Sequence, residues 1–326
     1  MLAALLQMMS DGQFHSGEDL GKRLGVSRAA VWKALKRLED GGYPIHRVRG
    51  KGYRIPEGAC LLDLARIQEA LPEYLAADIS WQLLDSVDST NAEAMRALAA
   101  GVSSTAMHVC LAEQQTSGRG RRGREWVSPY AQNIYLSAAV PFSEGAQKLE
   151  GLSLMVGLVL VETLEACGFN ECRLKWPNDV LLGGRKLAGI LVEIAGDLTA
   201  DCVVVIGVGI NVLMKDAESS ISQLWTSLLL SRQKGRLDRN ILVAEFLRRL
   251  LLALQVFRET GFSSFVSAWQ SRDAWYGLPV RVQAGSTGWS GVARGVDARG
   301  ALRLATAEGE LLLNGGEVSL RLNDDS

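Results

Sequence analysis

The chain has 326 residues, of which 48% are apolar and 22% are charged, and its net charge is −1. This length allows two or three domains with a large buried core, and the composition is ordinary for a globular protein. A net charge this close to zero does not by itself indicate nucleic-acid binding, so the charge of each segment has to be examined separately. The five cysteines are scattered, odd in number and without metal-ligand spacing, which predicts a reducing compartment with most of them buried or inert.

No segment has the pattern of an export signal or a membrane span. The N-terminal MLAALLQMMSDG lacks both a basic start and a sustained apolar run, so a signal peptide is not expected. The longest apolar stretch, around 152–161, is too short to cross a bilayer and contains Gly157. We therefore expect a cytoplasmic protein with no membrane partner.

Residues 1–56 are basic, with a net charge of +5 that leaves −6 for the rest of the chain. Ser16 is placed to cap a first helix, Gly25 allows a sharp turn, and Ser27 is placed to cap a second helix. The inward apolar positions are Leu20 and Leu24 in the first helix, and Val31, Leu35 and Leu38 in the second. This spacing predicts two helices that meet at a short turn.

The next segment, YPIHRVRGKGYRI, alternates like a hairpin that turns at Gly50-Lys51-Gly52. Two helices followed by a basic hairpin resemble a winged helix-turn-helix, with the second helix in the major groove and the hairpin along phosphate. The alternative is a small helical cap with a solvated basic face. The expected DNA-binding residues are Ser27, Arg28, Lys33, Arg47, Arg49 and Lys51.

The remaining chain divides into a connector, a mixed region and a strand-rich end. Residues 57–80 contain a short apolar helix, LLDLARIQEAL, between prolines and glycines. Residues 81–270 mix strands, such as VVVIGVGINV, with helices, such as LSLMVGLVLVETLEACG and RNILVAEFLRRLLLALQVF. From 272 onwards, short strands alternate with glycine turns and predict a small β-barrel or sandwich.

The run Gly118-Arg119-Gly120-Arg121-Arg122-Gly123-Arg124 places four arginines among three glycines. Arginines so close together repel one another and are not expected in a core. Guanidinium groups and backbone N–H groups between glycines bind phosphate oxygens well, which favours a polyphosphate-binding loop. A flexible basic surface loop or an RNA-binding tract is the alternative, although strand-like segments, HVCLAEQ and NIYLSAAV, frame this run.

A second constellation, KWPND, precedes a Gly183-Gly184 turn and the segment RKLAGILVE. It predicts a hairpin whose second strand begins at Lys186. An ammonium entering an apolar strand needs an anion, which a ligand carboxylate or phosphate would supply. Asn178 and Asp179 are candidates for holding a metal or a sugar edge. Alternatively, these two residues only shape a turn, and Lys186 extends to solvent.

Together, GRGRRGREW, KWPNDVLL, RKLAGILVE and GVGINV are similar to the signature runs of the biotin–protein ligases, and the resemblance covers essentially the whole chain. The N-terminal module and the C-terminal strands fit the bifunctional bacterial form, which is also the biotin-operon repressor. The resemblance implies an α+β protein of three domains. These are a winged helix-turn-helix (1–60), a mixed-sheet α/β ligase domain of the biotin/lipoate type (61–271) and a small SH3-like β-barrel (272–326).

The resemblance also implies roles for individual residues. Lys186 and Arg121 are expected to be catalytic. The implied biotin-binding residues are Ser89, Thr90, Asn91, Gln115, Arg119, Gly120, Arg121, Lys186 and Gly189. The implied nucleotide-binding residues are Arg121, Trp126, Asn178, Asp179, Asn211, Trp225 and Arg321. No metal-ligand set is expected in the chain, and Mg²⁺ is expected with ATP.

The implied reaction makes biotinyl-5′-AMP from biotin and ATP and transfers biotin to a lysine of the biotin carboxyl carrier protein of acetyl-CoA carboxylase. Biotinyl-5′-AMP would also be the corepressor that drives a homodimer onto the operator of the biotin genes. Three alternatives remain open at this point. They are a lipoate or octanoate ligase, a ligand-sensing repressor without transfer activity, and an RNA-binding module that uses the arginine-glycine loop.

Overall fold

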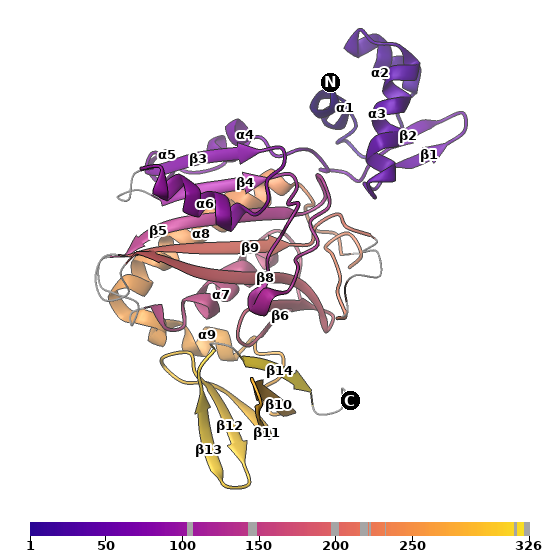
Figure 1. The fold of residues 1–326 in the computed structure, drawn as a ribbon. Coiled ribbons are helices and arrows are strands. Elements are labelled where there is room, and N and C mark those ends of the chain that lie inside the picture. The colour runs from indigo at the N-terminus through magenta and orange to yellow at the C-terminus, as the bar shows by residue number, and fades with distance from the viewer. Residues whose placement is uncertain are drawn as a thin grey trace.

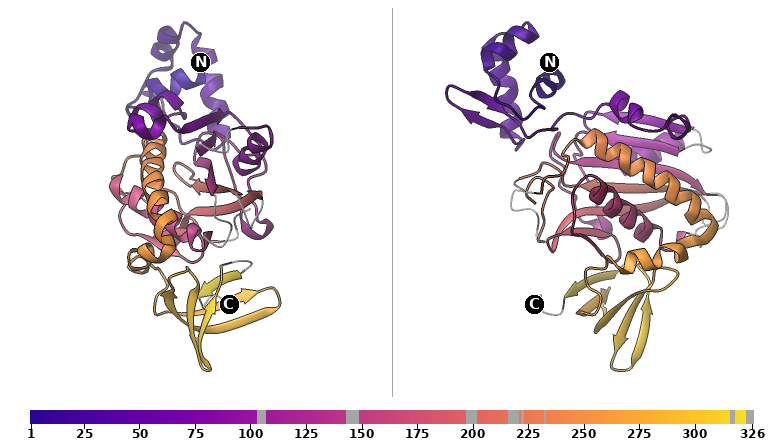
Figure 2. Two further views of the ribbon diagram at one scale, coloured as in Figure 1. Left: turned by 90° about the vertical axis from the view of Figure 1, so that its left-hand side faces the viewer. Right: turned by 180° about the vertical axis from the view of Figure 1, so that it is seen from behind.

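The chain folds into three parts that follow one another along the sequence (Figure 1). The computed structural model describes residues 1–326 except 103–106, 143–148, 197–201, 216–220, 222, 232, 316–317 and 323–326. The N-terminal module and the C-terminal strands lie at opposite ends of the central part (Figure 2). The expected α+β organisation in three domains is thereby confirmed.

The N-terminal module has the predicted helices, turn and hairpin. The hydroxyl oxygen of Ser16 accepts a hydrogen bond from the amide of Asp19, and that of Ser27 accepts one from the amide of Ala30. Gly25 has φ 66°, a left-handed conformation that glycine adopts without strain. Gly52, expected in the turn, already belongs to the second strand. The elements are α1 (Leu2–Met8), α2 (Gly17–Leu24), α3 (Arg28–Asp40), β1 (His46–Val48) and β2 (Gly52–Arg54).

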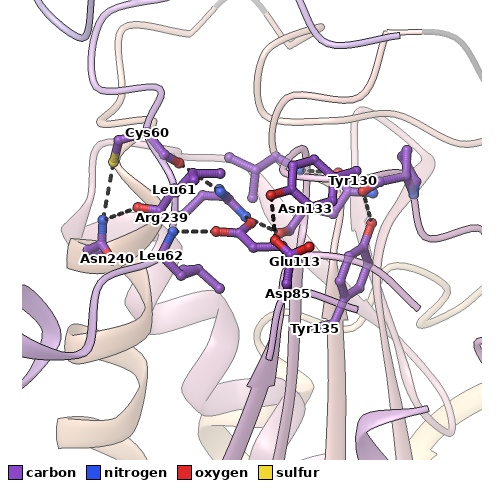
Figure 3. Close-up of polar contacts among 12 residues, drawn as sticks. Cys60, Leu61, Leu62, Asp85, Glu113, Tyr130, Asn133, Tyr135, Arg239 and Asn240 are labelled. Atoms are coloured by element: carbon purple, nitrogen blue, oxygen red, sulfur yellow. Dashed lines mark hydrogen bonds and ion pairs between the residues drawn. The ribbon is translucent and has the colours of Figure 1, made fainter. Parts of the chain in front are cut away.

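A fully buried arginine ties the connector to the central part (Figure 3). Arg239 pairs with Glu113 at 2.7 Å and also donates to the carbonyl oxygens of Cys60 and Asn133. The other carboxylate oxygen of Glu113 accepts from the amide of Leu62. The chain is therefore fixed where it leaves the N-terminal module. Two short helices follow in the connector, α4 (Leu64–Glu69) and α5 (Glu73–Ala76).

The central part is a mixed seven-stranded sheet in the order β3-β4-β5-β9-β8-β7-β6. β3 and β4 are parallel and the other neighbours are antiparallel. β3 begins inside the expected connector, and β8 begins one residue before the expected Lys186. The strands are β3 (Ile79–Leu84), β4 (Met107–Ala112), β5 (Ile134–Phe142), β6 (Cys172–Lys175), β7 (Asp179–Leu182), β8 (Arg185–Gly196) and β9 (Cys202–Ile210).

Helices cover both faces of this sheet (Figures 1 and 2). α7 (Leu152–Ala166) and α8 (Arg239–Thr260) pack together on one face, and α6 (Thr90–Ala99) lies on the other. α7 is mostly apolar and buried because it packs against strands of the sheet and, along its side, against α8. This confirms both predicted core helices.

The C-terminal strands form one antiparallel sheet in the order β13-β12-β11-β10-β14. The indole nitrogen of Trp176 donates to the carbonyl oxygen of Gly300, which ties this sheet to the central part beside the KWPND segment. The connecting elements are η3 (Gly261–Phe265) and α9 (Val266–Gln270). The strands are β10 (Pro279–Ala284), β11 (Thr287–Val296), β12 (Leu302–Thr306), β13 (Gly309–Leu313) and β14 (Val318–Leu322).

Candidate functional site

A pocket lies where the arginine-rich loop, the central sheet and the C-terminal strands meet. Its volume, including the space that is open to solvent, is about 1000 Å³. Twelve of the predicted biotin- and nucleotide-binding residues line it: Ser89, Thr90, Asn91, Gln115, Arg119, Gly120, Arg121, Trp126, Asn178, Asp179, Lys186 and Gly189.

One end of the pocket is a buried polar network at the start of α6. The side-chain oxygen of Gln115 accepts hydrogen bonds from the amide and the hydroxyl of Thr90, at 2.9 and 3.1 Å. Ser137 donates to the side-chain oxygen of Asn91 at 2.6 Å, and Asn91 donates to Glu193 at 2.7 Å. These partners hold the amide and hydroxyl groups in fixed orientations. The network therefore offers a small polar ligand a pre-organised set of donors and acceptors.

Glycines on the sheet leave the space that this wall of the pocket needs. A Cβ atom on Gly207 would collide with the side chain of Asn91, and one on Gly209 would lie 2.5 Å from the indole of Trp126. Trp126 therefore lies flat against β9 at the pocket. Its indole N–H is buried and has no hydrogen-bond acceptor among the described residues. A buried donor of this kind is costly unless a ligand or water accepts from it.

The arginine-rich loop closes one side of the pocket. It contains a short turn, η1 (Arg121–Gly123), and the amide of Gly120 donates to the carbonyl oxygen of Arg124 at 2.7 Å. Arg121 donates to the side-chain oxygen of Asn178 at 3.1 Å and to the carbonyl oxygen of Gly315 in the C-terminal part. Burial lowers the pKa of Arg121. The loop is thus joined to both the KWPND segment and the C-terminal sheet.

Lys186 has a protein anion as its partner. Its ammonium nitrogen lies 2.8 Å from a carboxylate oxygen of Asp179 and 5.4 Å from the ring centre of Trp126. Both members of the pair are mostly buried, with 15% and 13% of their side chains exposed. The sequence predicted a ligand carboxylate or phosphate as this anion, or a lysine that extends to solvent. In the structure β7 supplies a protein partner, Asp179, beside the lysine.

Asn211 and Trp225 line a neighbouring hollow that shares Trp126 and Lys186 with the main pocket. The backbone of Lys186 is bridged to that of Trp225, and Asn211 donates to the carbonyl oxygen of Thr226 at 3.0 Å. Arg321 lies outside both linings, on β14 directly after Val318, Ser319 and Leu320, which do line the main pocket. The predicted nucleotide-binding residues other than Arg321 are therefore divided between two adjoining spaces.

Lys175 also lines the pocket and is not among the predicted site residues. Its ammonium lies 4.5 Å from the ring centre of Trp275, and burial lowers its pKa. The sequence carried a signal for it, because a lysine at the end of an apolar strand is as unusual there as Lys186.

The predicted DNA-binding residues lie on the outer surface of the N-terminal module. Arg28 and Lys33 are exposed on α3, and Arg47, Arg49 and Lys51 are exposed in the β1–β2 hairpin. Ser27 is exposed but is engaged as the cap of α3. The five cations are spread over a helix and a hairpin of one module, which suits an extended polyanion.

The described residues contain no cluster of three or more His, Cys, Asp or Glu side chains suited to a metal ion. Asp179 and Glu125 are the carboxylates of the main pocket. No helix of the described chain is long and apolar enough to cross a membrane.

The architecture and the pocket define a ligase of the biotin and lipoate type that carries a helix-turn-helix module. Residues 83–211 match the biotin/lipoate A/B protein ligase family. Residues 2–54 match a helix-turn-helix domain, and residues 277–321 match the biotin protein ligase C-terminal domain.

Similar proteins agree over nearly the whole length. The chain is 41% identical to the bifunctional ligase/repressor BirA of Salmonella typhimurium, over 97% of this chain and 96% of that protein. It is 40% identical to the Escherichia coli protein of the same name, with the same coverage. A biotin protein ligase from Aquifex aeolicus in complex with biotin and ATP aligns with a TM-score of 0.63 and 29% identity, over 75% of this chain and 99% of that one. The chain belongs to the biotin protein ligase family.

Proposed function

We propose that this protein activates biotin with ATP and attaches it to a lysine of the biotin carboxyl carrier protein of acetyl-CoA carboxylase. The observation that carries the proposal is one pocket with a polar network at one end and Arg121 and Lys186 beside it. The network around Asn91 and Gln115 suits the ureido ring of biotin, which has two N–H donors and a carbonyl acceptor. The cations suit the biotin carboxylate and the phosphates of ATP.

In the first step, a biotin carboxylate oxygen attacks the α-phosphorus of ATP and pyrophosphate leaves, which forms biotinyl-5′-AMP. Negative charge grows on the phosphoryl oxygens, so fixed cations lower the barrier. Lys186 stabilises this charge from β8. Arg121 stabilises it from the loop and is held in place by Asn178. Asn211 and Trp225, in the adjoining hollow, contact the nucleoside.

In the second step, the amine of the carrier lysine attacks the biotinyl carbonyl, and AMP leaves with the electron pair of the anhydride bond. Water would hydrolyse the same anhydride, so the intermediate has to be covered until the carrier arrives. The arginine-rich loop provides this cover, because Arg121 connects it to the C-terminal part through the carbonyl oxygen of Gly315.

Mg²⁺ fits this pocket as a partner of ATP. Magnesium in phosphate-transfer sites is commonly held by one or two carboxylates and by substrate phosphates. Asp179 lines the pocket and would take this role once a ligand phosphate replaces it as the partner of Lys186. When bound, the ion would neutralise charge on the leaving pyrophosphate.

The second half of the proposal is repression. In it, residues 1–60 bind the operator DNA of biotin genes, residues 61–271 bind the ligands, and residues 272–326 complete the pocket. The basic surface formed by α3 and the β1–β2 hairpin supports DNA binding. We further propose that biotinyl-5′-AMP promotes the homodimer that binds DNA, and that the protein works in the cytoplasm.

Incubation of the full chain with biotin, Mg-ATP and a biotin carrier domain tests the ligase. Intact mass should rise on the carrier by the mass of one biotinyl group, and lipoate in place of biotin serves as the matched control. An unmodified carrier, together with an absence of ATP–pyrophosphate exchange, would contradict the ligase and leave a ligand-sensing repressor. Preferential transfer of lipoate would instead assign the other branch of the family.

A further inference from the structure

α3 exposes a tryptophan on the surface that the proposed function gives to DNA. Trp32 is 44% exposed, whereas Trp176 and Trp269 are among the largest fully buried side chains of the described chain. A single exposed apolar residue is unremarkable by itself. The position of Trp32 on α3, among basic residues, indicates a specific role for its side chain.

Trp32 lies on an exposed flank of α3. Residues four apart are neighbours on a helix, so Arg28 lies one turn before the indole and Lys36 one turn after it. Ala29, three residues earlier, is exposed on the same side. The buried side of the helix carries Val31, Leu35 and Leu38, so the row of Arg28, Trp32 and Lys36 runs along the flank of the helix, about a quarter-turn from the core side at Trp32. This row therefore presents an apolar centre between two cations.

The charge around this centre selects the kind of occupant. Among the described residues, Arg28 and Lys33 have no carboxylate within 4.0 Å. Lys36 pairs with Glu39 and Asp40 at the far end of the helix, so the unpaired charge lies near the start of α3. The exposed cations of the β1–β2 hairpin add to the same module. A polyanion would neutralise these positive charges, whereas the apolar surface of another protein would leave them without counter-charges.

The chemistry of the major groove then selects the contact. Its base edges carry hydrogen-bonding groups except for the C5-methyl of thymine, which is apolar. Residues near the N-terminus of a recognition helix approach the bases, and Trp32 is the fifth residue of α3. We propose that Trp32 is a specificity-determining residue whose indole packs on thymine methyl groups, so that it selects A·T pairs in the operator. This inference rests on the DNA-binding half of the proposed function.

Thymine-to-deoxyuridine substitution tests the contact, because it removes one methyl group and keeps the base pairing. Duplexes are first enriched from a random-sequence library with the full chain in saturating biotin and Mg-ATP. Each thymine of the enriched duplex is then replaced in turn, and the dissociation constants are measured for the wild type, Trp32→Ala and Trp32→Phe. Tyr74→Ala removes another exposed aromatic, on α5, and is the matched control.

At one or two thymines in each half-site, loss of the methyl group should weaken wild-type binding about fourfold, the equivalent of one buried methylene. Trp32→Ala should bind the intact duplex more weakly and be insensitive to those same substitutions. Trp32→Phe should keep part of the sensitivity, and Tyr74→Ala should keep all of it. A library enriched again with Trp32→Ala should lose its preference for A·T at the same positions.

Equal costs of methyl removal in the wild type and Trp32→Ala at every thymine would overturn the inference and leave the repressor intact. A wild-type chain that enriches no sequence would remove the repressor half as well, while biotin transfer would continue. If Trp32→Ala leaves DNA affinity unchanged but weakens self-association in ultracentrifugation, the residue belongs to a protein interface and the inference is wrong.

Discussion

Lys186 and Asp179 form an ion pair of 2.8 Å across the β7–β8 hairpin, at the wall of the main pocket. Each neutralises the other where ATP is proposed to bind. An incoming phosphate competes with Asp179 for the ammonium, and the carboxylate then becomes available to a divalent cation. The ion pair therefore offsets the cost of burying both charges in the absence of ligand. When the ligand binds, a phosphate replaces Asp179 as the partner of Lys186, and a divalent cation replaces Lys186 as the partner of Asp179.

Lys186→Ala should slow adenylation strongly in a chain that still folds, with some loss of stability because Asp179 is left without its counter-charge. Removal of a cation that stabilises charge in the transition state costs about 3–4 kcal/mol of activation free energy. Biotin-dependent ATP–pyrophosphate exchange measures the step, and Lys234→Ala, an exposed lysine away from the pocket, is the control. Exchange at the wild-type rate in Lys186→Ala would show that this lysine is not catalytic.

Arg121→Gly should release biotinyl-5′-AMP into solution, because the link from the loop to Asn178 and Gly315 is lost. The dissociation rate of the adenylate should rise, and lysines of unrelated proteins should become biotinylated. Arg173→Ala, an exposed arginine on β6, should leave both unchanged. The proposed covering role of the loop fails if the adenylate dissociates from Arg121→Gly at the wild-type rate.

Helix caps and turns could be predicted from the sequence because they depend on neighbouring residues. The contacts within the site could not, because they join residues whose pairing the sequence does not reveal. Ser16, Gly25 and Ser27 act within a few residues of themselves, so their caps and turn could be predicted from the sequence. The partner of Lys186 could not, because a bulge between Val180 and Leu181 shifts the register of the hairpin that joins the pair.

The buried ion pair of the central part was beyond sequence reasoning for the same reason. Arg239 begins α8 and Glu113 follows β4, 126 residues apart, and no periodicity connects them. Sequence patterns likewise gave no reason to place β14 at the pocket, since this depends on how the C-terminal sheet docks, and only the resemblance pointed to this strand, through Arg321. The family resemblance supplied the residue roles that the patterns could not.

Glu113→Ala should destabilise the protein by about 3–5 kcal/mol, because it leaves the guanidinium of Arg239 buried without its counter-charge. Urea unfolding measures the change. Glu310→Ala breaks the exposed pair with Arg303 and should change the free energy of unfolding very little. Equal effects of the two substitutions would contradict the importance assigned to burial.

Asp273→Asn should stabilise the protein near neutral pH. Burial raises the pKa of Asp273 from 3.8 to about 6, so the folded state disfavours the carboxylate. The unfolded chain loses its proton first as the pH rises, and stability falls between about pH 4 and pH 6. In the wild type, the carboxylate of Asp273 accepts a hydrogen bond from the backbone amide of Trp275 at 3.0 Å. The side-chain oxygen of asparagine can accept the same hydrogen bond.

The variant should gain about 1–3 kcal/mol at pH 7 and nothing at pH 3, as measured by denaturant unfolding at both values. Asp297→Asn, whose carboxylate also accepts backbone amides but in an exposed turn, is the control. A gain of the same size at both pH values would assign the effect to something other than ionisation.

The last prediction is that biotinyl-5′-AMP promotes a dimer and that the dimer is the form that binds operator DNA. One chain presents a single α3 and a single β1–β2 hairpin, which gives few base contacts, so specific binding needs two copies on a two-fold related site. Ligand contacts that fix pocket-lining segments before association lower the free-energy cost of forming an interface, which couples ligand binding to dimer formation.

Sedimentation with and without biotin plus Mg-ATP measures this coupling between ligand and dimer. Gel shifts on a biotin-gene promoter measure DNA binding, with Arg28→Ala and Lys51→Ala expected to weaken it and to reduce its salt dependence. A chain that stays monomeric when saturated with the adenylate, or a deletion of residues 1–56 that still binds the promoter, would remove the repressor role and leave the ligase.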